Sequence, residues 1–252
     1  MEVLVSFAQH AQDVILVHAL KDYNPREVFW IDVGSNDPVN ISVTLLFSML
    51  GGHGINIEPQ EMYRKRYENL RQRDINLFVG VGENGGGEMI LYGSGDTATM
   101  TKTGNVSKAY KVPVVTLNEI FDKHVLNTQV VHFLKVDVEG FETEVIRGLD
   151  ITVHQPWIIC IECLEGENFD EYELKLLKNP GGYIFAYFDG QNRYYVRKDK
   201  NDIIENFKSM DNLNKYYEIV SMQEATKWLS YEQSTSWKIT APLRKLLSFF
   251  RK

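Results

Sequence analysis

The chain has 252 residues, which is enough for one full hydrophobic core with short extensions. Hydrophobic residues make up 44% and charged residues 24%, which excludes disordered and fibrous classes, and the sequence contains no run of about 18 apolar residues that would span a membrane. The net charge of -7 argues against a nucleic-acid partner. With two cysteines and no secretory signal at residues 1–6, we expect a reducing, cytoplasmic location.

Strand-like and helix-like segments alternate through the middle of the chain. Strands separated by helix-length segments predict βαβ units, and strands that are apolar almost throughout predict a parallel sheet covered on both faces. The fold class is therefore α/β. We expect strands at residues 28–33, 54–58, 76–81, 131–138 and 157–161, and helices at residues 39–50, 61–71 and 141–148.

Three regions depart from this alternation. Residues 82–110 are rich in Gly, Ser and Thr, with one short strand expected at 89–92. Residues 183–188 and 193–197 flank a turn sequence, which predicts a terminal antiparallel hairpin. The pattern after residue 198 is polar and helical. We therefore divide the chain into an N-terminal helical segment that packs on the core (1–27), a core domain (28–200) and a helical C-terminal extension (201–252).

Polar residues follow the first predicted strand, and an acid ends the second. Gly34 lets the backbone approach a ligand closely, Asp37 can cap the next helix, and Pro38 suits its first position. Glu58 stands about 25 residues further on, where an acid typically binds ribose hydroxyls. The plain alternative is an ordinary turn at Gly34 and a simple cap at Asp37. The residues expected at a nucleotide-type site here are Asp32, Gly34, Ser35, Asn36, Asp37 and Glu58.

Two cofactors, NAD and S-adenosylmethionine (SAM), compete for this arrangement. NAD carries a pyrophosphate and is typically bound by G-x-G-x-x-G, whereas this turn offers only Gly34. An acid at the start of the helix would also repel a diphosphate. SAM carries a sulfonium and an ammonium group, with which Asp32 and Asp37 are compatible. The charge argument therefore favours SAM over NAD.

Ionisable residues alternate with valines on the strand at 131–138. A period of two places Lys135, Asp137 and Glu139 on one side of it, and Gly140 marks its open end, so Asp137 and Glu139 should face the ligand cleft. Glu162 ends the next strand near the same edge. Three carboxylates there should raise one another's pKa. They could also bind a divalent cation, although we favour a site without a metal. The alternative for Lys135 and Glu139 is a structural ion pair.

Four segments, taken in order, resemble the FkbM family of SAM-dependent methyltransferases. They are residues 31–39, 54–59, 133–142 and 159–162, and the likeness covers roughly residues 5–165. Gln12 stands where an acid is common in that family. The resemblance implies a Rossmann-like methyltransferase fold in residues 28–200, with Asp32 and Gly34 at the methionine side of SAM. It also implies that Glu58 holds the ribose and that Val81 approaches the adenine.

The resemblance and the carboxylates together predict the reaction. We expect transfer of a methyl group to a sugar hydroxyl of a bacterial surface glycan or its precursor, with contributions from Lys135, Asp137, Glu139 and Glu162. Asp137 is the first candidate for contact with the reacting centre and also with the cofactor. One alternative is a metal-dependent glycosyltransferase that uses Asp137 and Glu139. Another is a non-catalytic module that docks other enzymes of glycan biosynthesis.

The last residues, 234–252, form a basic tail without any acid. Leu243, Leu246, Leu247 and Phe250 have the i, i+3, i+4, i+7 spacing of one apolar helix face. In an otherwise acidic chain, this pattern predicts peripheral contact with the inner face of an anionic membrane or with a partner protein. The alternative is a terminal helix that docks on the body of the protein.

Overall fold

The computed structural model describes residues 2–95, 109–163, 182–210 and 217–222. The tail at residues 234–252, for which we predict membrane or partner contact, lies outside these ranges. Within them, no helix is both long enough and apolar enough to cross a membrane.

A seven-stranded sheet forms the centre of the protein, in the order β10-β11-β9-β8-β2-β3-β4. The neighbours from β9 to β4 pair in parallel. β11 runs antiparallel to both β9 and β10, so β10 regains the direction of the parallel strands. The predicted α/β class with a largely parallel sheet is confirmed. The strands are β2 Phe29–Val33, β3 His53–Ile57, β4 Ile75–Leu77, β8 Phe133–Val136, β9 Ile158–Glu162, β10 Tyr183–Phe188 and β11 Asn192–Arg197.

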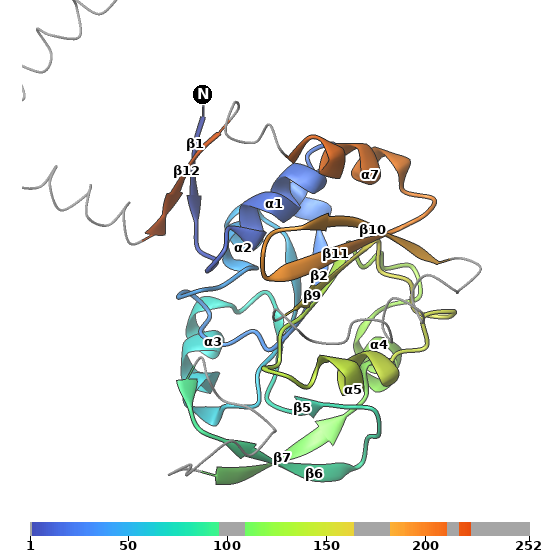
Figure 1. The fold of residues 1–252 in the computed structure, drawn as a ribbon. Coiled ribbons are helices and arrows are strands. Elements are labelled where there is room, and N and C mark those ends of the chain that lie inside the picture. Colours follow the sequence, from blue (N-terminus) through green and yellow to red (C-terminus); the bar gives the residue numbers. More distant parts are fainter. Residues whose placement is uncertain (1, 96–108, 164–181, 211–216, 223–252) are drawn as a thin grey trace, which may run out of the picture.

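Helices cover both faces of this sheet (Figure 1). Side chains that alternate along β2 and β8 divide the core in two: Trp30 and Phe133 pack with α1, α2 and α7, whereas Ile31 and Leu134 pack with α4 and α5. Strands buried on both faces are what near-continuous apolar segments predict. The helices are α1 Gln12–Ala19, η1 Pro25–Glu27, α2 Leu45–Met49, η2 Glu61–Tyr63, α3 Arg64–Leu70, α4 Leu117–His124, α5 Glu142–Arg147 and α7 Asn201–Lys208.

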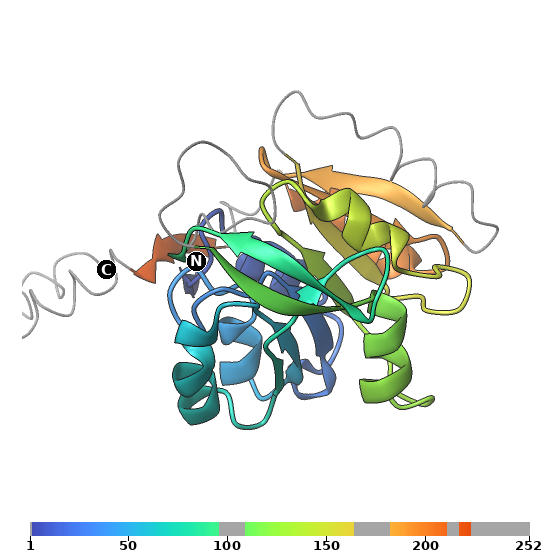
Figure 2. The same cartoon turned by 90° about the horizontal axis from the view of Figure 1, so that it is seen from below.

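Two smaller sheets flank the central one. In one of them, β5 (Gly80–Val81) and β6 (Gly87–Tyr92) pair with the two sides of β7 (Ala109–Val115). This sheet lies at the bottom of Figure 1 and toward the viewer in Figure 2. The other joins β1 (Glu2–Ser6) in parallel to β12 (Tyr217–Ser221). The N-terminal segment therefore holds a strand in addition to the helix that we expected.

Two element predictions are wrong in their bounds. The segment 76–81 is not one strand, because the chain leaves the central sheet after β4 and Gly80 pairs with Val114 in the small sheet. The helix expected over 39–50 is confined to α2, and Ile41 has a φ of +53° that no helix contains. Asp37 consequently caps a turn, with Oδ1 accepting hydrogen bonds from the backbone N–H groups of Val39 and Asn40.

A buried arginine fixes the edge of the central sheet near β3 and β4. Arg71 lies 2.7 Å from Asp74 and donates to the hydroxyl of Thr44 at 2.9 Å. Asp74 in turn accepts from the Asn56 amide at 3.1 Å. Both members of the ion pair have side chains that are fully buried, so neither can be solvated if its partner is removed.

We therefore expect Arg71→Leu to lower the free energy of unfolding by about 3–5 kcal/mol, because it leaves the Asp74 carboxylate buried without its cation. Urea denaturation checks this. Lys65→Leu is the matched control, since Lys65 is exposed on α3 and should change stability by less than about 0.5 kcal/mol. Equal losses in the two variants would contradict the role of the pair.

Candidate active site

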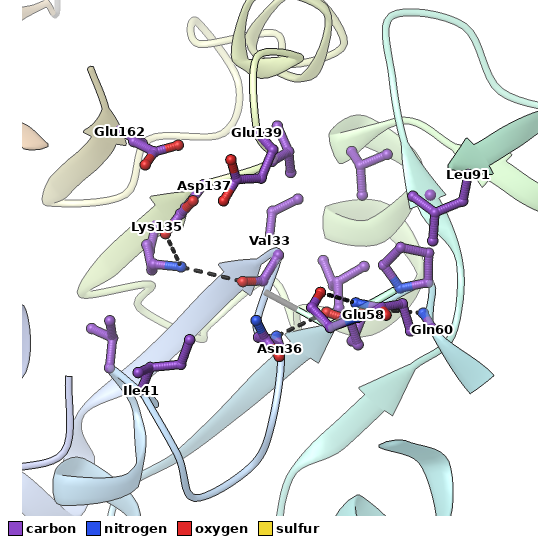
Figure 3. Close-up of a pocket in the computed structure, with 18 of the residues that line it drawn as sticks. Val33, Asn36, Ile41, Glu58, Gln60, Leu91, Lys135, Asp137, Glu139 and Glu162 are labelled. Atoms are coloured by element: carbon purple, nitrogen blue, oxygen red, sulfur yellow. Dashed lines mark hydrogen bonds and ion pairs between the residues drawn. The ribbon is translucent and has the colours of Figure 1, made fainter. Parts of the chain in front are cut away.

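A cavity opens at the carboxyl ends of β2, β3, β8 and β9 (Figure 3). Ligands of open α/β sheets bind at this edge. Most of the residues predicted from the sequence come together here, on turns that follow different strands. Those that line the cavity are Gly34, Asn36, Glu58, Val81, Lys135, Asp137, Glu139 and Glu162.

Three predicted residues, Asp32, Ser35 and Asp37, are buried and do not line the cavity. Asp32 is an ion-pair partner of Lys135 at 3.4 Å. Ser35 accepts a hydrogen bond from the Tyr67 hydroxyl at 2.8 Å, and Asp37 pairs with Arg66 at 2.5 Å. The structure thus gives these three polar groups protein partners, where we expected direct contact with a cofactor.

The turn after β2 needs a glycine because the backbone of another strand end comes close to it. Gly34 has a φ of +78°, and a Cβ atom there would lie 1.7 Å from the carbonyl oxygen of Asp137. A side chain at this position would push apart the ends of β2 and β8. Gly34 therefore keeps Asp137 beside the first turn.

Glu58, at the end of β3, connects two of the turns around the cavity. Its Oε2 accepts from the backbone N–H of Asn36 and its Oε1 from that of Gln60, both at 2.8 Å. Burial raises the pKa of Glu58 to about 7, while these two donors counteract the rise. The carboxyl group is thus held in a fixed orientation toward the cavity.

Gln60 extends this connection to the segment after β6, although no motif in the sequence points to this residue. Its Nε2 donates to the carbonyl of Gly95 at 2.8 Å, and its Oε1 accepts from the N–H of Gly95 at 2.7 Å. Gly95 lines the cavity, as do the apolar side chains of Val79, Val81 and Leu91. The paired bonds of Gln60 therefore hold an apolar-walled part of the cavity together.

Lys135 is buried between two carboxylates. Its Nζ lies 3.4 Å from Asp32 and 3.1 Å from Asp137, and it donates to the carbonyl of Gly34 at 3.3 Å. Burial alone would lower the pKa of Lys135, but Asp137 and Asp32 raise it above its usual value. Lys135 is therefore a permanent cation. Its ion-pair partners are Asp32 and Asp137, whereas the sequence suggested Glu139 as a partner.

Asp137, Glu139 and Glu162 point toward one another across the cavity (Figure 3), with one oxygen from each within 4.8 Å of the others. Burial, followed by the charges of Asp137 and Glu139, raises the pKa of Glu162 to about 9. The prediction that these acids raise one another's pKa is confirmed for Glu162. At neutral pH this group carries a proton, and the three oxygens also have the spacing to coordinate a divalent cation.

His132 and the cysteines lie away from the cavity lining. Nδ1 of His132 accepts from the backbone N–H of Phe29 at 3.2 Å, and burial lowers the pKa of this histidine to about 4. It is a structural histidine that stays neutral at physiological pH. Cys160 and Cys163 are buried and form no disulfide.

The comparison with known protein families identifies the domain that contains this cavity. A family model described as the methyltransferase FkbM domain matches residues 32–211, which is over two thirds of the chain. Every predicted site residue falls within this range. No curated protein matches the chain significantly in sequence.

The protonation of Glu162 predicts how stability depends on pH. Its pKa is about 9 in the folded protein and near 4.5 in the unfolded chain, so the folded state holds an additional proton between these values. Its contribution to stability is complete below about pH 4.5 and is lost as the pH rises toward 9. Glu162→Gln removes this loss, so the variant should gain stability relative to wild type as the pH rises from 5 to 9.

Urea denaturation at several pH values measures the effect. Glu144→Gln on α5, outside the cavity lining, is the control and should follow the wild-type profile. Parallel profiles for wild type and Glu162→Gln would show that Glu162 does not bind the additional proton.

Proposed function

The chain belongs to the FkbM methyltransferase family, and from this premise we propose that it is a SAM-dependent O-methyltransferase acting on a sugar hydroxyl. The acceptor is a bacterial surface glycan or its precursor. The observation that carries the proposal is the cavity at the carboxyl edge of the sheet, which is lined by Glu58 after β3, Asp137 after β8 and Glu162 at the end of β9.

The residues present fit SAM in three respects. Glu58 is a carboxyl group fixed at the end of β3, where ribose hydroxyls can donate to it. Val79, Val81 and Leu91 provide apolar surface for a flat base. Among the charged residues of the described lining, the acids outnumber the one lysine, which suits a cationic sulfonium and disfavours a diphosphate. When bound, SAM supplies an electrophilic methyl group.

Asp137 is the group best placed to receive the proton of an acceptor hydroxyl. Lys135 holds one of its oxygens at 3.1 Å, which fixes the carboxylate at the mouth of the cavity. Glu162 is protonated at neutral pH, so it can donate a hydrogen bond to an acceptor oxygen. Glu139 is exposed at the same edge and is accessible to a large acceptor.

Two parts of the proposal rest on the family resemblance and on the basic tail. They are the glycan acceptor and a cytoplasmic location at the inner face of the membrane. The tail would bring the enzyme to lipid-linked precursors or to partner enzymes. The reaction itself needs only a hydroxyl that reaches Asp137, and sugars present several.

A second function is favoured by one observation, the close approach of Asp137, Glu139 and Glu162. Three carboxylate oxygens at this spacing would suit the Mn²⁺ ion of a metal-dependent glycosyltransferase. That enzyme would bind a nucleotide sugar together with the metal and would show no affinity for SAM.

Calorimetric titration separates the two functions. We expect the purified chain to bind S-adenosylhomocysteine (SAH), the demethylated cofactor, because SAH retains the ribose and the base. Neither UDP-glucose in the presence of Mn²⁺ nor, in a separate titration, NADH should give a heat of binding. A folded sample that does not bind SAH but binds UDP-glucose with Mn²⁺ would overturn the methyltransferase proposal.

We further expect Asp137→Asn to lower the rate of methyl transfer by about 100-fold or more, the usual contribution of a general base. The rate is measured as the transfer of tritium from [methyl-³H]SAM to cell-envelope glycan. Glu144→Gln is again the control and should retain the wild-type rate. Full activity of Asp137→Asn would remove Asp137 from the role of base.

A further inference from the structure

Gln12 lies outside the matched domain and nevertheless lines the cavity. It is the first residue of α1 and is only 4% exposed. A polar side chain at this depth normally has hydrogen-bond partners for all of its groups. The contacts of Gln12 therefore indicate what the cavity binds.

One end of the Gln12 side chain is occupied and the other is open. Its Oε1 accepts from the backbone N–H of His10 at 2.9 Å, which fixes the orientation of the amide. Within the described part of the chain, no residue accepts a hydrogen bond from Nε2 of Gln12. Two N–H donors thus remain for a ligand in the cavity.

Buried contacts hold this part of the chain in place. Asp13 is fully buried and accepts from the Ser6 hydroxyl at 2.6 Å and from the N–H groups of Phe7 and Val14 at 2.7 and 2.9 Å. These bonds tie residues 6–14 into one compact unit. The amide of Gln12 is therefore positioned before any ligand arrives, which lowers the entropic cost of binding.

The charges of the cavity indicate which ligand atom Gln12 would meet. Among the lining residues that the structure describes, Lys135 is the one cation, and it is paired with Asp32 and Asp137. The amino-acid moiety of SAM carries an ammonium group and a carboxylate. The ammonium suits the acids of the cavity, whereas the carboxylate needs N–H donors that are not already paired.

We propose that Nε2 of Gln12 binds the carboxylate of the cofactor's amino-acid moiety. This inference rests on the proposed SAM-dependent function. It extends the cofactor site to a segment that precedes the matched domain, and it gives α1 a role in binding besides its packing on the sheet.

Two cofactor fragments test the proposal by titration. SAH contains the amino-acid moiety, and 5′-methylthioadenosine lacks it. Gln12→Met removes the N–H donors without adding a charge. We expect it to weaken SAH binding about tenfold or more and to leave 5′-methylthioadenosine binding unchanged.

Gln72→Met is the matched control, because it makes the same change at an exposed position outside the cavity lining and should bind both compounds like wild type. Equal affinity of wild type and Gln12→Met for SAH would overturn the proposal, as would an equal loss for both compounds. Failure of wild type to bind SAH would refute the proposed function itself, so the two failures are distinguishable.

Discussion

The ion pairs of Lys135 join the two central strands at the point where the cavity begins. Asp32 on β2 and Asp137 beyond β8 share one buried ammonium group, which also reaches the carbonyl of Gly34. The carboxylates of Asp32 and Asp137 would repel each other without a cation between them, and a lone buried lysine would lose its charge. Because the three groups neutralise one another in part, the first turn and the end of β8 occupy fixed positions.

This network also separates the acids of the cavity into two kinds. Asp137 is held by a cation, whereas burial and the charges of Asp137 and Glu139 raise the pKa of Glu162 to about 9. One strand edge therefore presents an anionic oxygen and a protonated one within 4.8 Å. A hydroxyl can donate to the first and accept from the second, which is an arrangement that neutral sugars can use. A bound cation would instead require Glu162 to lose its proton.

The sequence predicts those parts of the fold and site that depend on local pattern. Apolar segments predict the strands of the central sheet, and the position of an acid at a strand end indicates that Glu58 and Glu162 line the cavity. Helix α4 was missed although Thr116 and Glu119 form a capping box at its start. The pairing of β1 with β12 brings together distant segments of the chain, which no local pattern reveals. For Asp37 the sequence shows an acid at a turn, but it does not show that Arg66, which lies far along the chain, forms an ion pair with it.

Glu58 shows how the walls of the cavity and the binding of a nucleoside depend on the same atoms. A carboxylate offers about four lone-pair positions, and the N–H groups of Asn36 and Gln60 occupy two of them. About two remain, which is the number that the two hydroxyls of a ribose can use. Gln60 in turn holds Gly95 through its side chain. Any displacement of Glu58 would therefore move the apolar wall together with the carboxyl group that we propose as the ribose contact.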